Sequence, residues 1–318
     1  MYIIGFDIGG TKCVVCIGEE VDDELFIRDK RIIPTDHSIT PYEMLDRMCA
    51  LAEEMTDCFD VIGISCGGPL DSKNGIIMSP PNLPGWDDIK IVEYLKEKYH
   101  TDVYLENDAN ACAVAEWKYG AGKGTSNMVF MTFGTGLGAG LILDGKLYRG
   151  ANDMAGEVGH IRFNAFGPVG YGKAGSFEGF CSGSGIAQLG KMYAQEKLQM
   201  GKRVSFCGSF SELENVTAKS IAECAYKGEQ DAIEIYETCG TMLGKGLSIL
   251  IDVLNPERIV LGSIFQRSES LIRPKMQEIL EKECLTYALN VCEVVPAKLG
   301  DDIGNYAALA VAAMNKEM

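Results

Sequence analysis

Two segments of the sequence share one pattern: an apolar run, a turn rich in glycine with a threonine, and a second apolar run. Residues 2–17 contain the turn Asp7-Ile8-Gly9-Gly10-Thr11-Lys12, and residues 128–143 contain the turn Gly134-Thr135-Gly136-Leu137-Gly138-Ala139-Gly140. Each segment is typical of a β-hairpin whose glycines let backbone N–H groups approach a phosphate. Because each hairpin comes early in its half of the chain, the repetition favours a bilobal fold that clamps a polyphosphate between two lobes.

These turns also admit other interpretations. Each hairpin taken alone is compatible with an ordinary tight turn. Gly134, Gly136 and Ala139 match the dinucleotide fingerprint G-x-G-x-x-G/A, but that fingerprint requires a helix after the turn, and here an apolar strand-like run follows. We therefore reject a dinucleotide site. The first turn adds a hydroxyl, an ammonium group and the carboxylate of Asp7, which can hold a metal through water.

A strand-to-helix junction carries a polar pair suited to catalysis. Residues 102–105 predict a strand, and residues 109–119 predict an alanine-rich helix that ends at Gly120. Asn107 and Asp108 lie between the two elements, where a side chain can stay exposed over the helix N-terminus. One carboxylate with an amide beside it suits a general base and a substrate-positioning partner. The alternative is that one of the two is only a helix N-cap.

Further polar groups lie in loops of the second half. Glu157 and His160 belong to a polar, glycine-rich loop and can turn toward one ligand, and Glu178 lies in the next glycine-rich loop. The other two histidines, His37 and His100, have polar neighbours in the sequence and no evident role. The three loop residues are therefore candidates for binding a polar ligand.

Two other positions bear on a ligand site. Residues 258–261 predict a buried strand that ends in Gly262 and Ser263, and the carboxyl end of a strand is a natural place for a nucleotide base. Trp86 lies in a turn-rich loop and is either a hydrophobic plug, which we favour, or a lid over a ligand.

Composition narrows the class of protein. The 318 residues, 47% hydrophobic and 23% charged, fit a globular protein of one large or two smaller domains. The formal net charge of −16 argues against a nucleic-acid partner, because phosphates would be repelled. We expect no membrane span and no signal peptide. Cys13 and Cys16, the one C-x-x-C among twelve cysteines, point to opposite faces of a strand, so we expect free thiols in a reducing cytoplasm.

Seven motifs, in this order, resemble those of ROK-type sugar kinases (repressor, open reading frame, kinase) of the sugar kinase/actin superfold. They span nearly the whole chain: Asp7-Ile8-Gly9-Gly10-Thr11-Lys12, Gly67-Gly68-Pro69, Asn82-Leu83-Pro84-Gly85-Trp86, Glu106-Asn107-Asp108-Ala109-Asn110, Gly134-Thr135-Gly136-Leu137-Gly138, Gly156-Glu157-Val158-Gly159-His160 and Asn255-Pro256-Glu257. The resemblance implies an α/β, two-lobed, ribonuclease H-like fold with nucleotide and sugar in the interlobe cleft. We expect residues 1–109 and the C-terminal helix 303–318 to form a small lobe, and residues 110–302 a large lobe.

The resemblance also implies roles for particular residues. Asp108 matches the catalytic base. The residues expected to bind the sugar are Gly68, Asn107, Asp108, Glu157, His160 and Glu178. The residues expected to bind ATP are Asp7, Gly9, Gly10, Thr11, Lys12, Gly134, Thr135, Gly136, Gly262 and Ser263. The family usually has a second glycine where this chain has Ser263, and Mg²⁺ would enter with ATP rather than be bound directly by protein side chains.

One loop departs from the family pattern. The family typically follows its Gly-His with C-x-C-G-x-x-G-C-x-E, in which three cysteines join the histidine on a structural zinc. Here Val169, Tyr171 and Ser176 occupy the three cysteine positions, and none is a good zinc ligand. We therefore expect no structural zinc, His160 as a sugar ligand only, and a loop held by packing that involves Tyr171.

The implied activity is ATP-dependent phosphorylation of a hexose, with glucose at its 6-hydroxyl the leading candidate. The alternatives are an N-acetylhexosamine kinase, for example for N-acetylmannosamine, and a non-catalytic sugar sensor. Sugar-sensing repressors of the family carry a helix-turn-helix before the first phosphate loop, and Asp7 follows Met1 too closely to leave room for one. We further expect a cytoplasmic homodimer.

Overall fold

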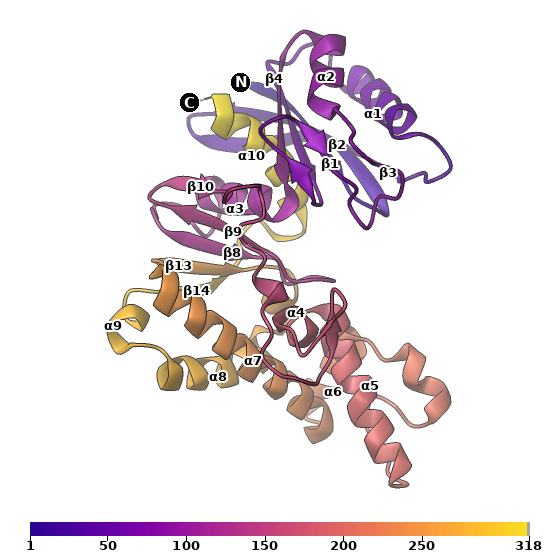
Figure 1. The fold of residues 1–318 in the computed structure, drawn as a ribbon, viewed down its shortest axis with the longest axis vertical. Coiled ribbons are helices and arrows are strands. Elements are labelled where there is room, and N and C mark those ends of the chain that lie inside the picture. Colours follow the sequence, from indigo (N-terminus) through magenta and orange to yellow (C-terminus); the bar gives the residue numbers. More distant parts are fainter. Residues whose placement is uncertain (317–318) are drawn as a thin grey trace. The chain divides into compact units, whose positions relative to one another are not determined.

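The structure, a computed structural model that describes residues 1–316, consists of two compact units (Figure 1). The first unit comprises Met1–Phe130, Gly140–Ala155 and the chain from Lys298 onward. The second comprises Met131–Ala139 and Gly156–Ala297. Among the described residues, no helix is long and apolar enough to cross a membrane.

A five-stranded sheet forms the centre of the first unit, in the order β3-β2-β1-β4-β7. Its strands are β1 (Tyr2–Ile8), β2 (Lys12–Val21), β3 (Glu24–Pro34), β4 (Val61–Cys66) and β7 (Asp102–Asn107). The first three strands form an antiparallel meander that includes the hairpin predicted for residues 2–17, and β4 and β7 run parallel to β1. The carboxyl ends of β1, β4 and β7 therefore meet at one edge of the sheet, where parallel α/β sheets bind their ligands.

One face of this sheet is covered by α1 (Pro41–Met55) and α2 (Ile91–Tyr99), as Figure 1 shows. Alternate strand residues point into this core because the side-chain period of a strand is two. A capping box is present at the start of α1, with Thr40 as the N-cap. Trp86 is buried in the same core, which confirms the hydrophobic plug.

The other face of the sheet is covered by α10 (Ile303–Lys316). A Cβ atom on Gly63 would lie 2.0 Å from the carbonyl oxygen of Ala308, so only glycine allows the helix this close. The sequence prediction that the C-terminal helix joins the N-terminal lobe is consistent with this packing. Residues 317 and 318 of that expected helix lie outside the described residues.

The grouping of the remaining elements differs from the sequence-based division at residue 109. Helix α3 (Asp108–Tyr119), together with Gly140–Ala155, belongs to the first unit rather than to the larger lobe of residues 110–302. Helix α3 packs on α10, and the buried Glu116 carboxylate accepts hydrogen bonds from the backbone N–H groups of Lys298 (2.9 Å) and Leu299 (2.8 Å). This long-range link has no local signature in the sequence.

The second five-stranded sheet has the order β10-β9-β8-β13-β14. Its strands are β8 (Met128–Met131), β9 (Ala139–Leu143), β10 (Lys146–Tyr148), β13 (Arg258–Leu261) and β14 (Glu293–Pro296). The helices of the second unit include α4 (Phe177–Phe180), α5 (Gly183–Gln199), α6 (Ala218–Ala225), α7 (Gln230–Leu254), α8 (Ile264–Glu283) and α9 (Thr286–Leu289). A short hairpin, β11 (Val169–Gly170) and β12 (Lys173–Ala174), lies in the loop that lacks the family's cysteines.

Helix α8 was missed by the sequence analysis. Pro274 lies inside it and Ser268 has non-helical backbone angles (φ −129°, ψ 23°), so the helical pattern is broken twice. The pattern that identifies it is Ile272, Met276 and Leu280, which are fully buried at helical spacing.

Candidate active site

Polar side chains gather at the carboxyl ends of the parallel strands in the first unit. Asp7 on β1 pairs in register with Ser65 on β4, and Ser65 pairs with Glu106 on β7. Residues in register on parallel strands point to the same face, so these three side chains form a row. Asn107 and Asp108 follow Glu106 directly along the chain, where β7 ends and α3 begins. The structure thus brings the predicted Asp7, Asn107 and Asp108 to one edge of the sheet.

Asn107 and Asp108 have separate roles. Asn107 is the N-cap of α3, and its Oδ1 accepts a hydrogen bond of 3.0 Å from the N–H of Ala109. Asp108 is the first residue of the helix, and its Oδ1 also accepts from that N–H, at 2.8 Å. The N-cap position of the capping alternative thus belongs to Asn107, and Asp108 shares the same N–H through one of its two carboxylate oxygens.

The Asp108 carboxylate is suited to accept a proton. Its side chain is exposed to solvent, but the surrounding protein limits its hydration. This desolvation raises the pKa of Asp108 above the usual value. The hydrogen bond from the N–H of Ala109 lowers the pKa and offsets only part of the rise. A carboxylate with a raised pKa is a stronger base, and general-base efficiency rises as the pKa approaches the working pH. Beside it, a Cβ atom on Gly68 would lie 3.1 Å from Nδ2 of Asn107, so the predicted Gly68 lies against the amide of this pair.

A buried ion pair between Glu106 and Arg149 lies next to the junction of β7 and α3. Glu106 is fully buried, and its carboxylate accepts hydrogen bonds from Nε of Arg149 (2.7 Å), Nδ2 of Asn110 (3.0 Å) and the N–H of Asn107 (3.0 Å). Burial raises the pKa of Glu106, and the Arg149 charge opposes that rise. No role of Glu106 or Arg149 was expected from the sequence, although a charged residue next to Asn107 in an apolar strand is a usable signal.

The first predicted phosphate loop, Gly9 to Lys12, is held mainly through its backbone. The N–H of Gly9 donates to the carbonyl of Lys12 (3.1 Å), and a Cβ atom on Gly10 would lie 2.2 Å from the carbonyl oxygen of Asn82. His37, which had no evident role in the sequence, has Nε2 2.8 Å from the carbonyl oxygen of Gly10. The side chains of the two residues that end the turn, Thr11 and Lys12, are exposed.

Asp7 lies on β1, just before this loop, and its carboxyl group has a raised pKa. Burial, together with the charge of Asp108, raises the pKa of Asp7 to about 6, and the ammonium group of Lys12 partly offsets the rise. A cation near Asp7 would relieve the repulsion between the two carboxylates. The donor chemistry therefore fits a divalent cation that arrives with a polyphosphate and is held through water.

The second predicted phosphate loop, residues 134–138, lies in the second unit. Its backbone is fixed by bonds from Gly183 N–H to the carbonyl of Gly134 (2.7 Å) and from Ser184 Oγ to the carbonyl of Thr135 (2.7 Å). In the part of the chain that the structure describes, the N–H groups of Thr135 and Gly136 donate to no protein acceptor. These two donors are available to phosphate oxygens.

The expected adenosine loop adjoins this second loop. The N–H of Gly262 donates to the carbonyl of Met131 (3.0 Å), and the N–H of Ile264 donates to that of Phe133 (2.9 Å). Ser263 has φ +48°, a region that favours glycine, which matches the glycine that the family usually has here. Gly262, Ser263 and the second phosphate loop are thus neighbours, as the sequence predicts for a nucleotide site.

The predicted sugar-binding residues of the second unit lie beside the same loop. The N–H of Ala139 donates to the carbonyl of Gly156 (3.0 Å), which anchors the segment that carries Glu157 and His160. The side chains of Glu157 and His160 are exposed, and Glu178 is half-buried. The Glu178 carboxylate accepts a hydrogen bond of 3.0 Å from the N–H of Leu137, next to Gly136.

The loop without the family's cysteines is held by backbone hydrogen bonds. The N–H groups of Phe163 and Asn164 donate to the carbonyl of Gly175 (2.8 and 3.1 Å), and the N–H of Gly175 donates to that of Pro168 (2.9 Å). Tyr171 is 74% exposed, and its ring stands edge-on to that of His160 with the centroids 6.0 Å apart. Among residues 1–316, no group of three or more histidine, cysteine, aspartate or glutamate side chains could hold a metal. The absence of zinc stays a prediction.

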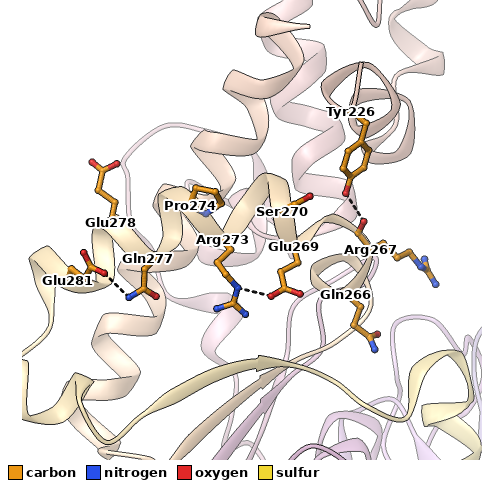
Figure 2. Close-up of a pocket in the computed structure, with 10 residues that line it drawn as sticks. All are labelled: Tyr226, Gln266, Arg267, Glu269, Ser270, Arg273, Pro274, Gln277, Glu278 and Glu281. Atoms are coloured by element: carbon orange, nitrogen blue, oxygen red, sulfur yellow. Dashed lines mark hydrogen bonds and ion pairs between the residues drawn. The ribbon is translucent and has the colours of Figure 1, made fainter. Parts of the chain in front are cut away.

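A groove of about 890 Å³ along α8 contains none of these residues (Figure 2). It is lined by Tyr226, Gln266, Arg267, Glu269, Ser270, Arg273, Pro274, Gln277, Glu278 and Glu281. Several of its polar groups pair with one another, for example Arg273 with Glu269 at 2.6 Å. It therefore offers few polar groups free to bind a ligand.

Comparison with known proteins places the chain in a family. The model of the ROK family matches residues 3–315. A glucokinase of Halalkalibacterium halodurans is 31% identical, over 95% of this chain and 92% of that protein. A xylose repressor of Caldicellulosiruptor bescii is 27% identical, over 94% of this chain and 75% of the repressor.

A solved structure agrees with the fold. The ROK family glucokinase from Streptomyces griseus, in complex with glucose and AMPPNP, is 26% identical with a TM-score of 0.77, over 99% of this chain and 100% of that chain. The α/β fold and the family resemblance predicted from the sequence are thus confirmed: the chain belongs to the ROK family.

Proposed function

We propose that this protein is an ATP-dependent sugar kinase that phosphorylates a hexose, with glucose at its 6-hydroxyl as the leading substrate. The observation that carries the proposal is the junction of β7 and α3. Asn107 is the N-cap of the helix, the Asp108 carboxylate accepts the same Ala109 N–H with Oδ1, and the surrounding protein raises the pKa of Asp108. Similarity to a glucokinase at 31% identity over nearly the full length of both chains supports the kinase class.

In the proposed reaction, Asp108 accepts the proton of the sugar hydroxyl as its oxygen attacks the γ-phosphorus of ATP. A bond forms between the sugar oxygen and the γ-phosphorus. The bond from the γ-phosphorus to the bridging oxygen breaks, and ADP leaves with that electron pair. The products are the sugar phosphate, ADP and a proton released from Asp108.

The two phosphate loops supply hydrogen-bond donors. The first loop offers the backbone N–H groups of Gly10 and Thr11 and the ammonium group of Lys12, and the second loop offers the N–H groups of Thr135 and Gly136. Donors fixed in advance stabilise charge that develops on the transferred group. Mg²⁺, which accompanies ATP, neutralises phosphate charge when it is bound. Asp7 is the carboxylate placed to hold it through water.

The sugar-binding group consists of Asn107, Glu157, His160 and Glu178, with Gly68 beside the Asn107 amide. The carboxylates accept hydrogen bonds from sugar hydroxyls, and the amide and imidazole groups can both accept and donate, so the set can meet hydroxyls at several ring positions. A polar site of this kind rejects a sugar that lacks a matching hydroxyl, because its own groups would be left unpaired. We also propose that the enzyme is a cytoplasmic homodimer.

The test is kcat/KM with Mg-ATP for glucose, mannose, fructose, allose, N-acetylglucosamine and N-acetylmannosamine. We expect glucose to have the highest value. A clear preference for an acetamido sugar would replace the glucose assignment and keep the kinase. No turnover with any of the six, despite intact ATP binding, would favour a sugar sensor, the function suggested by the similarity to a xylose repressor.

A further inference from the structure

The Glu178 carboxylate lies where the segment that carries Glu157 and His160 meets the second phosphate loop. Its Oε2 accepts a hydrogen bond of 3.0 Å from the N–H of Leu137, a residue of that loop. Its Oε1 takes part in no hydrogen bond within the described residues. The side chain therefore holds the loop with one oxygen and keeps the other for a ligand.

The contact around this carboxylate is close. A Cβ atom on Gly136 would lie 2.9 Å from Oε2 of Glu178. A Cβ atom on Gly159, between Glu157 and His160, would lie 2.1 Å from the carbonyl oxygen of Leu137 and 3.3 Å from Cβ of Glu178. Three segments of the second unit thus meet with no room for additional side chains: the phosphate loop, the Glu157–His160 loop and the start of α4.

The position of Glu178 is also fixed by its own backbone. It is the second residue of α4, and the Ser176 hydroxyl caps this turn by accepting from the N–H of Gly179 at 3.1 Å. A carboxylate carried on a capped turn has few ways to move except rotation of its side chain. A ligand that fixes this rotation fixes the hydrogen bond to Leu137 as well.

We propose that Glu178 is a positioning residue that couples sugar binding to the second phosphate loop, so that sugar and ATP bind with positive cooperativity. The inference rests on the proposed kinase function. A sugar hydroxyl that donates to Oε1 holds Oε2 on the N–H of Leu137. The loop is then kept in the conformation in which the N–H groups of Thr135 and Gly136 are free for phosphate. The second ligand binds to a loop that is already ordered and loses less conformational entropy.

The same loop offers a matched control. Ser184 Oγ donates to the carbonyl of Thr135 at 2.7 Å, so Ser184 also holds the loop. Ser184 is exposed and is not among the predicted sugar-binding residues. Removing its hydroxyl weakens the loop without touching the sugar-binding group. Ser184→Ala therefore separates loop support from coupling.

The experiment is calorimetric titration of the full chain with a non-hydrolysable ATP analogue and Mg²⁺, with and without saturating glucose or the sugar that the panel selects. We expect the sugar to tighten analogue binding by about 5- to 100-fold in the wild type, a usual range for coupled sites. In Glu178→Ala, analogue binding without sugar should weaken by about 5- to 10-fold, because a charge-assisted hydrogen bond is lost. The tightening by sugar should also disappear. Glu178→Gln keeps an oxygen for Leu137 and should bind the analogue nearly as the wild type does.

The controls decide between coupling and simple support of the loop. Ser184→Ala should weaken analogue binding by the same factor with and without sugar, so its coupling factor stays at the wild-type value. His160→Ala should require more sugar for saturation and then show wild-type coupling. Wild-type coupling in Glu178→Ala, or its equal loss in Ser184→Ala, would overturn the proposal. Failure of the kinase assignment is seen separately, as wild-type protein that phosphorylates no sugar of the panel, because the titrations with analogue alone still report whether Glu178 holds the loop.

Discussion

The candidate residues of the two units differ in the chemical groups that they offer and in how the surrounding protein changes those groups. In the first unit, three carboxyl groups, Asp7, Glu106 and Asp108, lie at the ends of β1 and β7, and the surrounding protein raises the pKa of each. In the second unit, the candidates are backbone N–H groups of a glycine-rich loop and the exposed side chains of Glu157 and His160. Substitutions in the first unit should therefore change turnover, pH dependence and stability, and those in the second should mainly change affinity.

The largest expected effect is on turnover. Asp108→Asn keeps the shape of the side chain and removes the base, so kcat should fall by about 10²- to 10⁴-fold with the sugar KM nearly unchanged. His160→Ala is the comparison from the second unit, and its effect should appear mainly in the sugar KM. Steady-state kinetics with Mg-ATP measure both. Near-normal turnover of Asp108→Asn would remove Asp108 from the catalytic role.

The next effect is on stability. Arg149→Met leaves the fully buried Glu106 charge without its cation, which should lower the free energy of unfolding at pH 7 by about 3 kcal/mol. Loss of Arg149 raises the pKa of Glu106 further, so the destabilisation should shrink as the pH falls and Glu106 takes up a proton in the folded state. Urea unfolding at several pH values measures this.

A surface pair provides the control for Arg149. Arg28 and Glu19 lie 2.6 Å apart, with the Arg28 side chain 53% exposed. Arg28→Met should cost less than about 1 kcal/mol, because exposed ion pairs contribute little. If Arg28→Met and Arg149→Met lower the free energy of unfolding equally, the burial of Glu106 is not the cause of the destabilisation in Arg149→Met.

Substitution of Asp7 should change the free energy of unfolding by a smaller amount and in the opposite direction. Its pKa is about 6 in the folded protein, against an ordinary value of 3.8, so above pH 6 the ionised carboxylate destabilises the fold. Asp7→Asn should therefore raise the free energy of unfolding at pH 7 by about 2 kcal/mol, although activity should fall. Below about pH 4 the acid is protonated in both states and the gain should vanish. Thermal unfolding across this pH range is the measurement. If Asp7→Asn is less stable than the wild type at pH 7, the pKa of Asp7 is not raised in the folded protein.

In the second unit, a backbone substitution should have a modest effect. Ser263 has φ +48°, so Ser263→Gly should stabilise the protein by about 0.5–1 kcal/mol through relief of strain. Ser270→Gly, within α8, should instead destabilise it by a similar amount, because glycine is a poor helix former. The melting temperatures of the two variants should move in opposite directions. A shift of the same sign in both would argue against strain at Ser263.

The smallest expected effect concerns the metal. Val169, Tyr171 and Ser176 stand where the family has zinc-binding cysteines, and backbone hydrogen bonds hold the loop. Elemental analysis should find no stoichiometric zinc, and a chelator should leave the melting temperature unchanged. One tightly bound zinc per chain, with loss of the fold on chelation, would show that the alignment of this loop is incorrect.

Local patterns were enough to predict much of the fold and the position of the catalytic candidate. The antiparallel meander β1-β2-β3 follows from short turns between apolar runs, and the start of α1 follows from the capping box at Thr40. The strand–helix junction at Asn107 and Asp108 was readable because an apolar run is followed directly by an alanine-rich one. Helix α8 was missed because Pro274 and the kink at Ser268 interrupt its pattern.

What the sequence determined by itself is where strands, turns and polar groups occur, since these depend on neighbours within a few residues. Only the tertiary structure decided which group of the Asn107–Asp108 pair caps the helix and which long-range partners the carboxylates find. Glu106 pairs with Arg149, 43 residues away, and Glu178 with the N–H of Leu137, 41 residues away. The packing of α10 against Gly63 likewise joins distant segments. Such contacts depend on the topology of the whole chain, and local conformational propensities do not determine which distant segments meet.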